Sequence, residues 1–180
     1  MIADWMETYT GKKIYVDNPN PEDICIEDIA HALSLQCRFN GHCRQFYSIA
    51  EHSVLVSQYC YSYKLEGLLH DAAEAYIGDM VRPIKFLFPL FNEIERKILE
   101  AIDKKFDCSI SHPKPFGRIV DEVDRRILTN EAHALFDDVS DWCISSNPLP
   151  DIVINCWSPQ VAEKEFLKQF EEVSRSEEKS

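Results

Sequence analysis

Residues 65–74 read Leu65-Glu66-Gly67-Leu68-Leu69-His70-Asp71-Ala72-Ala73-Glu74, so that His, Asp and Glu follow an apolar run within five positions. The Leu and Ala content predicts a buried helix over about 65–77 that stops near Gly78. In such a helix His70 and Glu74 share one face, and Asp71 lies about a third of a turn further round. Burial of these groups is costly unless they are paired or bind a metal ion. The segment therefore predicts a helical core with a polar site inside it.

The flanking sequence continues the helical pattern. Apolar residues recur at three- and four-residue intervals from Ile26 to Cys37, and Ser48 followed by Glu51 is typical of a helix N-terminus. Further apolar stripes predict helices over about 91–106, from after Pro115 to about Phe136, and over 161–173. The intervening residues, 78–90 with Pro83 and Pro89 and the acidic stretch 137–159, are expected to be loops.

The N-terminal segment has a different pattern. Thr10-Gly11 predicts a turn between residues 5–9 and 12–16, which would form a short β-hairpin. We therefore expect an all-α helical bundle with a short N-terminal hairpin. It would form a single domain over residues 1–174 with a flexible tail over 175–180.

Composition limits the classes of function. With 180 residues, 45% apolar and 28% charged, the chain has an ordinary globular composition. It has neither a long apolar run nor a basic, apolar N-terminal signal, so we expect no membrane span and a cytoplasmic protein. The net charge of −12 argues against binding long nucleic acid, but not against a small anionic substrate near a metal ion. Seven cysteines without CxxC spacing predict free thiols rather than a cysteine-built zinc site.

Two other segments repeat the combination of apolar context and ligand-type side chains. One is Ala50-Glu51-His52-Ser53-Val54-Leu55, and the other is Val120-Asp121-Glu122-Val123-Asp124. A His-Asp pair alone also occurs in surface turns and as a hydrogen-bonded core histidine. The apolar setting of all three segments instead favours a set of His52, His70, Asp71 and Asp124, suited to Zn, Mn, Fe or Co. Asp121 is the rival to Asp124.

The remaining histidines have several interpretations. His42, in a loop beside Gly41 and Arg44, would either contact a phosphate, act as a proton donor or make a structural hydrogen bond. His31 is expected to be a satisfied core histidine and His112 a surface residue. His133 would at most support the metal ligands from behind, without binding the ion itself.

In these segments the sequence resembles the HD-domain phosphohydrolase superfamily, and most closely its small 5′-deoxynucleotidase-like branch. The resemblance covers about Ile26 to Leu135 in the order of the family's motifs. These motifs match Arg38-Phe39, Ala50-Glu51-His52-Ser53, Leu69-His70-Asp71-Ala72-Ala73-Glu74, Gly78-Asp79, Arg82-Pro83-Ile84-Lys85, Asp124 and Asn130-Glu131-Ala132. The fold it implies is the HD-domain helical bundle.

The resemblance also implies roles. His52, His70, Asp71 and Asp124 would bind one divalent ion (Zn, Co, Mn or Fe), with a second ion accompanying a triphosphate, and Glu74 would be the catalytic carboxylate. The remaining residues would contact the substrate. Arg38 and Lys85 would contact the phosphate, Phe39 would stack near the base and Asp79 would bond the sugar. Two departures are Phe39, where Trp is common, and the short link between His52 and His70.

The implied activity is hydrolysis of the 5′-phosphate ester of a deoxynucleotide. The products are a nucleoside and either phosphate or triphosphate, as in phage relatives that act on dATP. The implied assembly is a homo-oligomer, a dimer or hexamer. The alternative is a non-catalytic nucleotide-sensing HD module, while the motifs of branches that act on cyclic dinucleotides or alarmones are not found. Retention of Glu74 with all four metal-ligand positions favours the enzyme.

Overall fold

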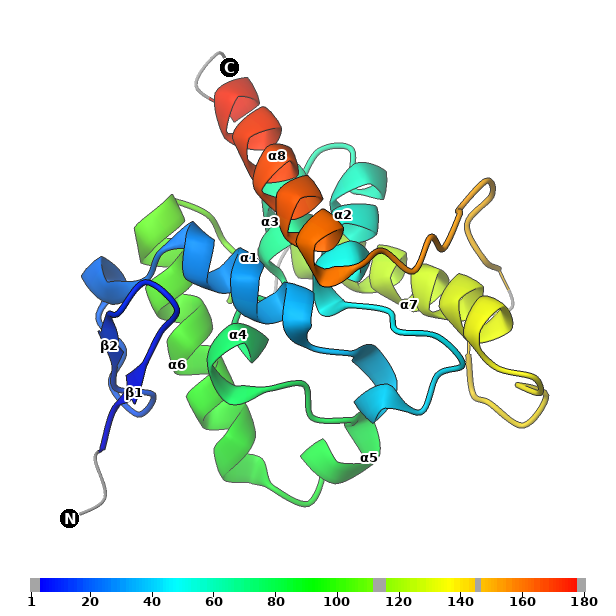
Figure 1. The fold of residues 1–180 in the computed structure, drawn as a ribbon, viewed down its shortest axis with the longest axis horizontal. Helices are drawn as coiled ribbons and strands as arrows, with labels where there is room; N and C mark the ends of the chain where they lie inside the picture. The colour runs from blue at the N-terminus through cyan, green and yellow to red at the C-terminus, as the bar shows by residue number, and fades with distance from the viewer. Residues whose placement is uncertain (1–3, 112–115, 145–146, 178–180) are drawn as a thin grey trace.

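The computed structural model describes residues 4–111, 116–144 and 147–177, and in them helices pack around two apolar clusters (Figure 1). In chain order the elements are β1 (Met6–Glu7), β2 (Lys13–Ile14), the 3-10 turn η1 (Pro21–Asp23), α1 (Ile26–Leu35), the 3-10 turn η2 (Arg38–Gly41), α2 (Ile49–Tyr59), α3 (Lys64–Leu69), α4 (Glu74–Ile77), α5 (Arg82–Lys85), α6 (Pro89–Phe106), α7 (Phe116–Leu135) and α8 (Pro159–Glu177). The predicted all-α architecture with a short N-terminal hairpin is confirmed.

The hairpin is antiparallel, with Met6 opposite Ile14. Its turn is fixed to α1 because Asp28 accepts hydrogen bonds from the Thr10 backbone N–H at 2.7 Å and the Thr10 hydroxyl at 2.9 Å. The Tyr9 ring also stacks on His31 of α1, with 3.7 Å between the ring centroids. The hairpin is therefore held against the bundle by the residues of its own turn.

Helix α2 begins as predicted but uses Glu51 differently. The Ser48 hydroxyl accepts a hydrogen bond from the Glu51 N–H at 3.0 Å, which confirms the N-cap. The Glu51 carboxylate does not return to Ser48. It is fully buried and accepts the backbone N–H groups of residues 155–157, at distances between 2.6 and 3.1 Å. The first turn of α2 thereby holds the chain just before α8.

The predicted continuous helix over 65–77 is wrong, because the chain forms α3, a tight turn and then α4. In the turn, the Ala72 N–H donates to the Leu69 carbonyl and the Glu74 N–H to the Asp71 carbonyl, a spacing of three residues rather than four. Asp71 therefore lies on a turn. His70 directly follows α3, whereas Glu74 is the first residue of α4.

Gly67 explains how closely α3 approaches α2. A Cβ atom at Gly67 would lie 3.1 Å from both Cys60 Cβ and Ser57 Cα, which is closer than ordinary contact. A side chain there would push α3 away from α2. The absence of one brings the end of α3, and with it His70, next to α2.

The other elements differ from expectation mainly at their ends. Residues 82–85, expected as loop, form the short α5, and α6 begins at Pro89. Helix α8 contacts α1 and α2 and continues through Glu177, so the tail predicted from residue 175 is helical for its first three positions (Figure 1). Positions 178–180 lie outside the described residues. Among the described helices, none combines the length and hydropathy needed to cross a bilayer.

Candidate metal centre

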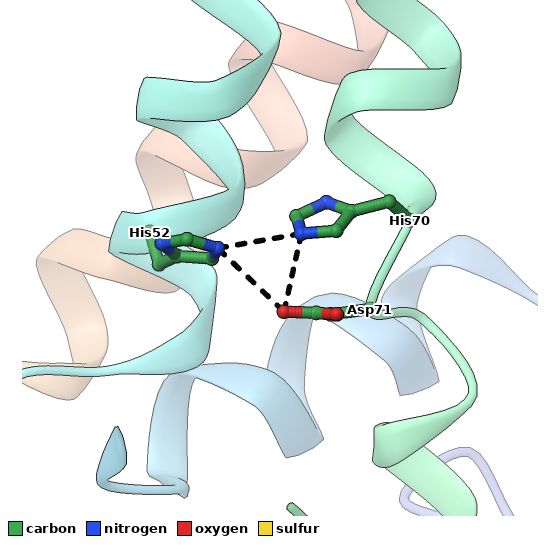
Figure 2. Close-up of side chains that lie close together, drawn as sticks. All are labelled: His52, His70 and Asp71. Atoms are coloured by element: carbon green, nitrogen blue, oxygen red, sulfur yellow. Dashed lines mark hydrogen bonds and ion pairs between the residues drawn. The ribbon is translucent and has the colours of Figure 1, made fainter. Parts of the chain in front are cut away.

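Three of the predicted metal ligands converge. His52 lies on α2, His70 directly follows α3 and Asp71 lies on the turn beyond it (Figure 2). His52 Nε2 is 3.3 Å from His70 Nε2 and 3.7 Å from Asp71 Oδ2, and His70 Nε2 is 3.3 Å from Asp71 Oδ2. One ligand atom from each residue falls within 4.8 Å of the others, so this group can bind a metal ion.

The hydrogen bonds on the far side of each imidazole fix which nitrogen faces the centre. His70 Nδ1 lies 2.9 Å from the Gly67 carbonyl, which can only accept, so Nδ1 carries the proton. His52 Nδ1 lies 2.6 Å from the buried carboxylate of Glu131 and donates to it in the same way. The two Nε2 lone pairs are thus directed at one another, an arrangement that requires a cation, either a proton or a metal ion. This donor set fits a divalent metal.

Asp124 supplies a fourth donor next to this group. It extends from α7 and places Oδ1 3.2 Å from His52 Nε2. Its rival Asp121 is exposed and lines a neighbouring cavity. Asp124 is therefore the carboxylate of α7 that reaches the histidines.

Glu131 organises the residues behind the centre. Its carboxylate is fully buried, accepts the Tyr47 hydroxyl at 2.8 Å and lies 3.3 Å from an Arg38 nitrogen. Another nitrogen of Arg38 is 3.4 Å from Asp71 Oδ2. Burial alone would raise the pKa of Glu131, but the charges of Arg38 and His52 outweigh it and lower that pKa. A chain of alternating charges thus connects Tyr47 to the ligands.

The same charges shift the ligands themselves. Burial and Arg38 lower the pKa of His52, yet the carboxylates of Glu131 and Asp124 overcome them and raise it to about 9. For Asp71, burial opposes ionisation, but the neighbouring histidines and Arg38 hold its pKa well below the usual range. For Asp124, burial is likewise outweighed by the hydrogen bond and charge of His52, and the pKa is lowered. Without a metal, a proton on His52 balances these carboxylates.

A cavity of about 590 Å³ opens beside the centre. Its lining contains the predicted catalytic carboxylate Glu74, the ligands Asp71 and Asp124, and every residue predicted to contact substrate: Arg38, Phe39, His42, Asp79 and Lys85. It also contains residues that were not singled out from the sequence as substrate contacts. Among these are the exposed Arg82 and an aromatic pair, Phe136 and Trp142, whose ring centroids are 4.8 Å apart.

Phe39 joins that pair. Its centroid is 5.1 Å from Phe136 and 6.2 Å from Trp142, so the three rings form one aromatic wall of the cavity. Trp142 comes from the acidic stretch expected to be a featureless loop. Its contribution depends on the chain folding back, which leaves no local pattern in the sequence.

Glu74 is the buried acid of the cavity. It is 5% exposed, with Oε1 3.7 Å from Lys85 Nζ, and Lys85 also donates to Glu95 at 2.8 Å. Burial, followed by the charges of Asp71 and Asp79, raises the pKa of Glu74 well above its ordinary value. The surroundings of Glu74 therefore disfavour its charged form relative to a carboxyl in water.

The remaining histidines lie away from the centre. His31 is half-buried and pairs with Glu163 at 3.3 Å, so it is satisfied as predicted but near the surface. His133 lies exposed on α7, so it does not support the ligands from behind. His42 is exposed and lines the cavity. His112 lies outside the described residues. The role behind the ligands belongs instead to Glu131, which lies two helical turns after Asp124.

The sequence is similar to two bacterial proteins. It is 36% identical to the uncharacterized protein YfdR of Escherichia coli (strain K12) over 174 residues, which cover 94% of this chain and 96% of YfdR. It is 33% identical over 135 residues to an uncharacterized protein of Rhodobacter capsulatus, with 69% of each chain covered. No protein-family model matches the sequence.

Proposed function

This chain belongs to the same family as YfdR, and we propose that it is an HD-type metal-dependent phosphohydrolase that cleaves the 5′-phosphate ester of deoxynucleotides. The observation that carries the proposal is the position of the His52, His70 and Asp71 group. It borders a cavity that combines cationic side chains, the buried carboxyl of Glu74 and an aromatic wall. A nucleotide offers the complementary groups: phosphate, a leaving oxygen and a flat base. The motif resemblance to HD phosphohydrolases supports the same assignment.

His52, His70, Asp71 and Asp124 would hold the ion. A divalent ion there makes water nucleophilic near neutral pH and polarises a phosphoryl oxygen. Arg38 is engaged by Asp71 and Glu131, so its main part is to keep Asp71 charged and oriented. Lys85 and the exposed Arg82 are then the side chains that would offset the phosphate charge.

Glu74 would act on the leaving group. Burial and the charges of Asp71 and Asp79 raise its pKa, a shift that favours the neutral acid and suits donation of a proton to the sugar oxygen as the phosphorus–oxygen bond breaks. Water would add to phosphorus as the bond to the sugar oxygen breaks, and the sugar oxygen would take the proton of Glu74. The proton lost by the water would return to Glu74, and the products would be the nucleoside and phosphate or triphosphate. Asp79 would bond the sugar, and the wall of Phe39, Phe136 and Trp142 would stack on the base.

The alternative is a nucleotide sensor without turnover. Both functions predict nucleotide binding in the cavity, so hydrolysis separates them. The homo-oligomeric state and the second ion that the resemblance implies stay predictions.

The deciding experiment uses metal-stripped protein reloaded with Mn, Co, Zn, Fe or Mg. Deoxynucleoside mono- and triphosphates are added and the products are separated by chromatography. We expect release of nucleoside with one of the metals, and loss of both metal content and turnover in His70→Ala. Asp124→Asn should also lose metal and turnover, whereas Asp121→Asn, the matched control on α7, should keep both. Nucleotide binding without any turnover would replace the enzyme with the sensor, and unchanged metal content in His70→Ala would remove the metal site.

A further inference from the structure

Two thiols touch at the two ends of a loop that lines the cavity. Cys37 immediately precedes η2 and Cys43 follows it, and their Sγ atoms are 3.6 Å apart. Both side chains are half-buried and both thiols are free. A disulfide has an S–S distance of about 2.05 Å, so the sulfurs need to approach by only about 1.5 Å. The pair is therefore close to bonding geometry.

The residues between the two thiols belong to the cavity. Arg38, Phe39 and His42 line it, while Phe39 and Asn40 have the positive φ angles of 57° and 51° that non-glycine residues rarely adopt. The ends of this loop are fixed, since the Arg38 N–H donates to the Tyr47 carbonyl and Cys37 pairs with Ser48. A covalent bond from Cys37 to Cys43 would close a small ring around the strained residues.

We propose that Cys37 and Cys43 are a redox-sensitive pair, which a small-molecule disulfide such as oxidised glutathione converts to a reversible intramolecular disulfide that restrains the loop 38–42. One protein thiolate attacks the small disulfide and releases one small thiol. The second protein thiolate then attacks the resulting mixed disulfide and releases the other. Two protein thiols are oxidised by two electrons, and their two protons end on the two released thiols. Formation of the bond does not rest on the proposed phosphohydrolase function.

The environment of Cys43 sets the expected rate. Its sulfhydryl donates to the Gln45 carbonyl at 3.0 Å, and burial together with the neighbouring Cys37 raises the pKa of Cys43 to about 11. Since only the thiolate attacks, the reaction should be slow at pH 7 and faster towards pH 9. The contact with Cys37 favours closure over accumulation of the mixed disulfide.

Other cysteines supply controls. Cys156 is the competing partner, because its thiol lies near enough to Cys37 for the two to interact electrostatically. Cys143 is exposed and also lines the cavity, and Cys60 is fully buried. If exposure alone decided the reaction, Cys143 would be modified. If proximity decides it, the bond will join Cys37 and Cys43.

The test is incubation of the full chain, with no metal or nucleotide added, in glutathione buffers of increasing oxidised fraction. Non-reducing peptide mapping by mass spectrometry follows. We expect a crosslinked pair of peptides containing Cys37 and Cys43, lighter by about 2 Da than the separate peptides and lost again on reduction. Cys37→Ser and Cys43→Ser should stop at a mixed disulfide on the remaining thiol, while Cys143→Ser should behave as the parent. No crosslink in the unmodified chain, or a crosslink from Cys37 or Cys43 to Cys156 instead, overturns the pair.

Hydrogen exchange tests the restraint separately. The amides of residues 38–42 should exchange more slowly in the oxidised than in the reduced chain, because the ring limits local opening. Equal exchange with the bond present overturns the restraint. Both readouts are independent of turnover, so failure of the proposed function would leave them unaffected.

Discussion

His52 and Glu131 share a hydrogen bond of 2.6 Å between Nδ1 and Oε1, and both side chains are fully buried. The two residues are 79 positions apart, on α2 and α7, so the bond exists only in the folded chain. It fixes the imidazole tautomer that presents Nε2 to Asp71, Asp124 and His70. Glu131 therefore orients the candidate metal centre without being a ligand.

Glu131→Gln should weaken metal binding by about 10- to 100-fold, the usual effect of removing a carboxylate behind a histidine ligand. The amide keeps the size of the side chain but offers His52 a weaker acceptor. Competition with a chromophoric chelator measures the affinity. Glu122→Gln, an exposed change on the same helix, is the control, and equal affinities for both variants would contradict the role of Glu131.

Metal binding should release a proton below about pH 9. The pKa of His52 is raised to about 9 in the metal-free chain, so His52 is protonated below that pH and the ion must displace the proton. Metal affinity should therefore rise as pH rises from 7 to 9 and level off above it. Calorimetry in buffers of different ionisation enthalpy counts the protons. An affinity independent of pH over this range would show that His52 is neutral or is not a ligand.

Glu74→Gln should lower turnover by about 10²- to 10⁴-fold, the usual contribution of a positioned acid or base. Glutamine retains the volume but has no proton to give, and the metal and nucleotide contacts lie on other residues. Calorimetric nucleotide binding and hydrolysis are measured on the same variant. Retained binding with lost hydrolysis is the expected result, and full hydrolysis would remove Glu74 from the mechanism. Glu66→Gln provides the comparison, since Glu66 lines the neighbouring cavity.

Trp142→Ala should weaken nucleotide binding by about 1–3 kcal/mol, the usual loss when one aromatic side chain stops stacking on a base. The same variant should bind deoxyribose 5-phosphate as the parent does, because that ligand has no base. Calorimetry with both ligands measures the difference. Tyr61→Ala, a change at an exposed aromatic residue, is the control. Equal losses for both ligands would place Trp142 at the phosphate or in the general stability of the loop.

Asp28→Ala should destabilise the chain by about 1.5–3 kcal/mol, since a charged acceptor of several hydrogen bonds is lost. Burial opposes ionisation of Asp28, but the hydrogen bonds from Cys25 and Thr10 lower its pKa below 3.8. Its contribution is therefore present above pH 3.8 and is lost as pH falls through the lower, folded value. Urea unfolding at pH 7 and pH 3 should give a smaller difference between parent and variant at pH 3. Glu27→Ala, exposed on the same helix, should have little effect at either pH.

The helices and the three residues of the candidate metal centre, His52, His70 and Asp71, were predictable because their signals are local. Apolar spacing located α1, α2, α6, α7 and α8, and Ser48 marked the start of α2. Polar groups inside apolar helices are rare enough that His52 and His70 stood out. Their convergence then followed from packing of their helices.

The rest depended on contacts between distant segments. The break after Leu69 separates His70 from Glu74, although the residue composition of 65–77 favours one helix. Glu131 and Trp142 acquire their roles from partners far along the chain. The Glu51 carboxylate likewise accepts the distant backbone N–H groups of residues 155–157 instead of bonding back to Ser48 at the start of its own helix. The sequence around each of these residues is equally compatible with a solvated helix face or loop.

The hydrogen bonds that Glu51 accepts also affect the order in which the structure forms during synthesis. The carboxylate that precedes His52 has its partners 104 to 106 residues later. At a synthesis rate of about 5–20 residues per second, roughly 5–20 s pass between the synthesis of Glu51 and that of its partners. During that interval α2 carries an acid that has no backbone N–H groups to accept, and water must solvate it. We therefore expect the candidate metal centre to reach its final geometry only once residues 155–157 can pack against α2.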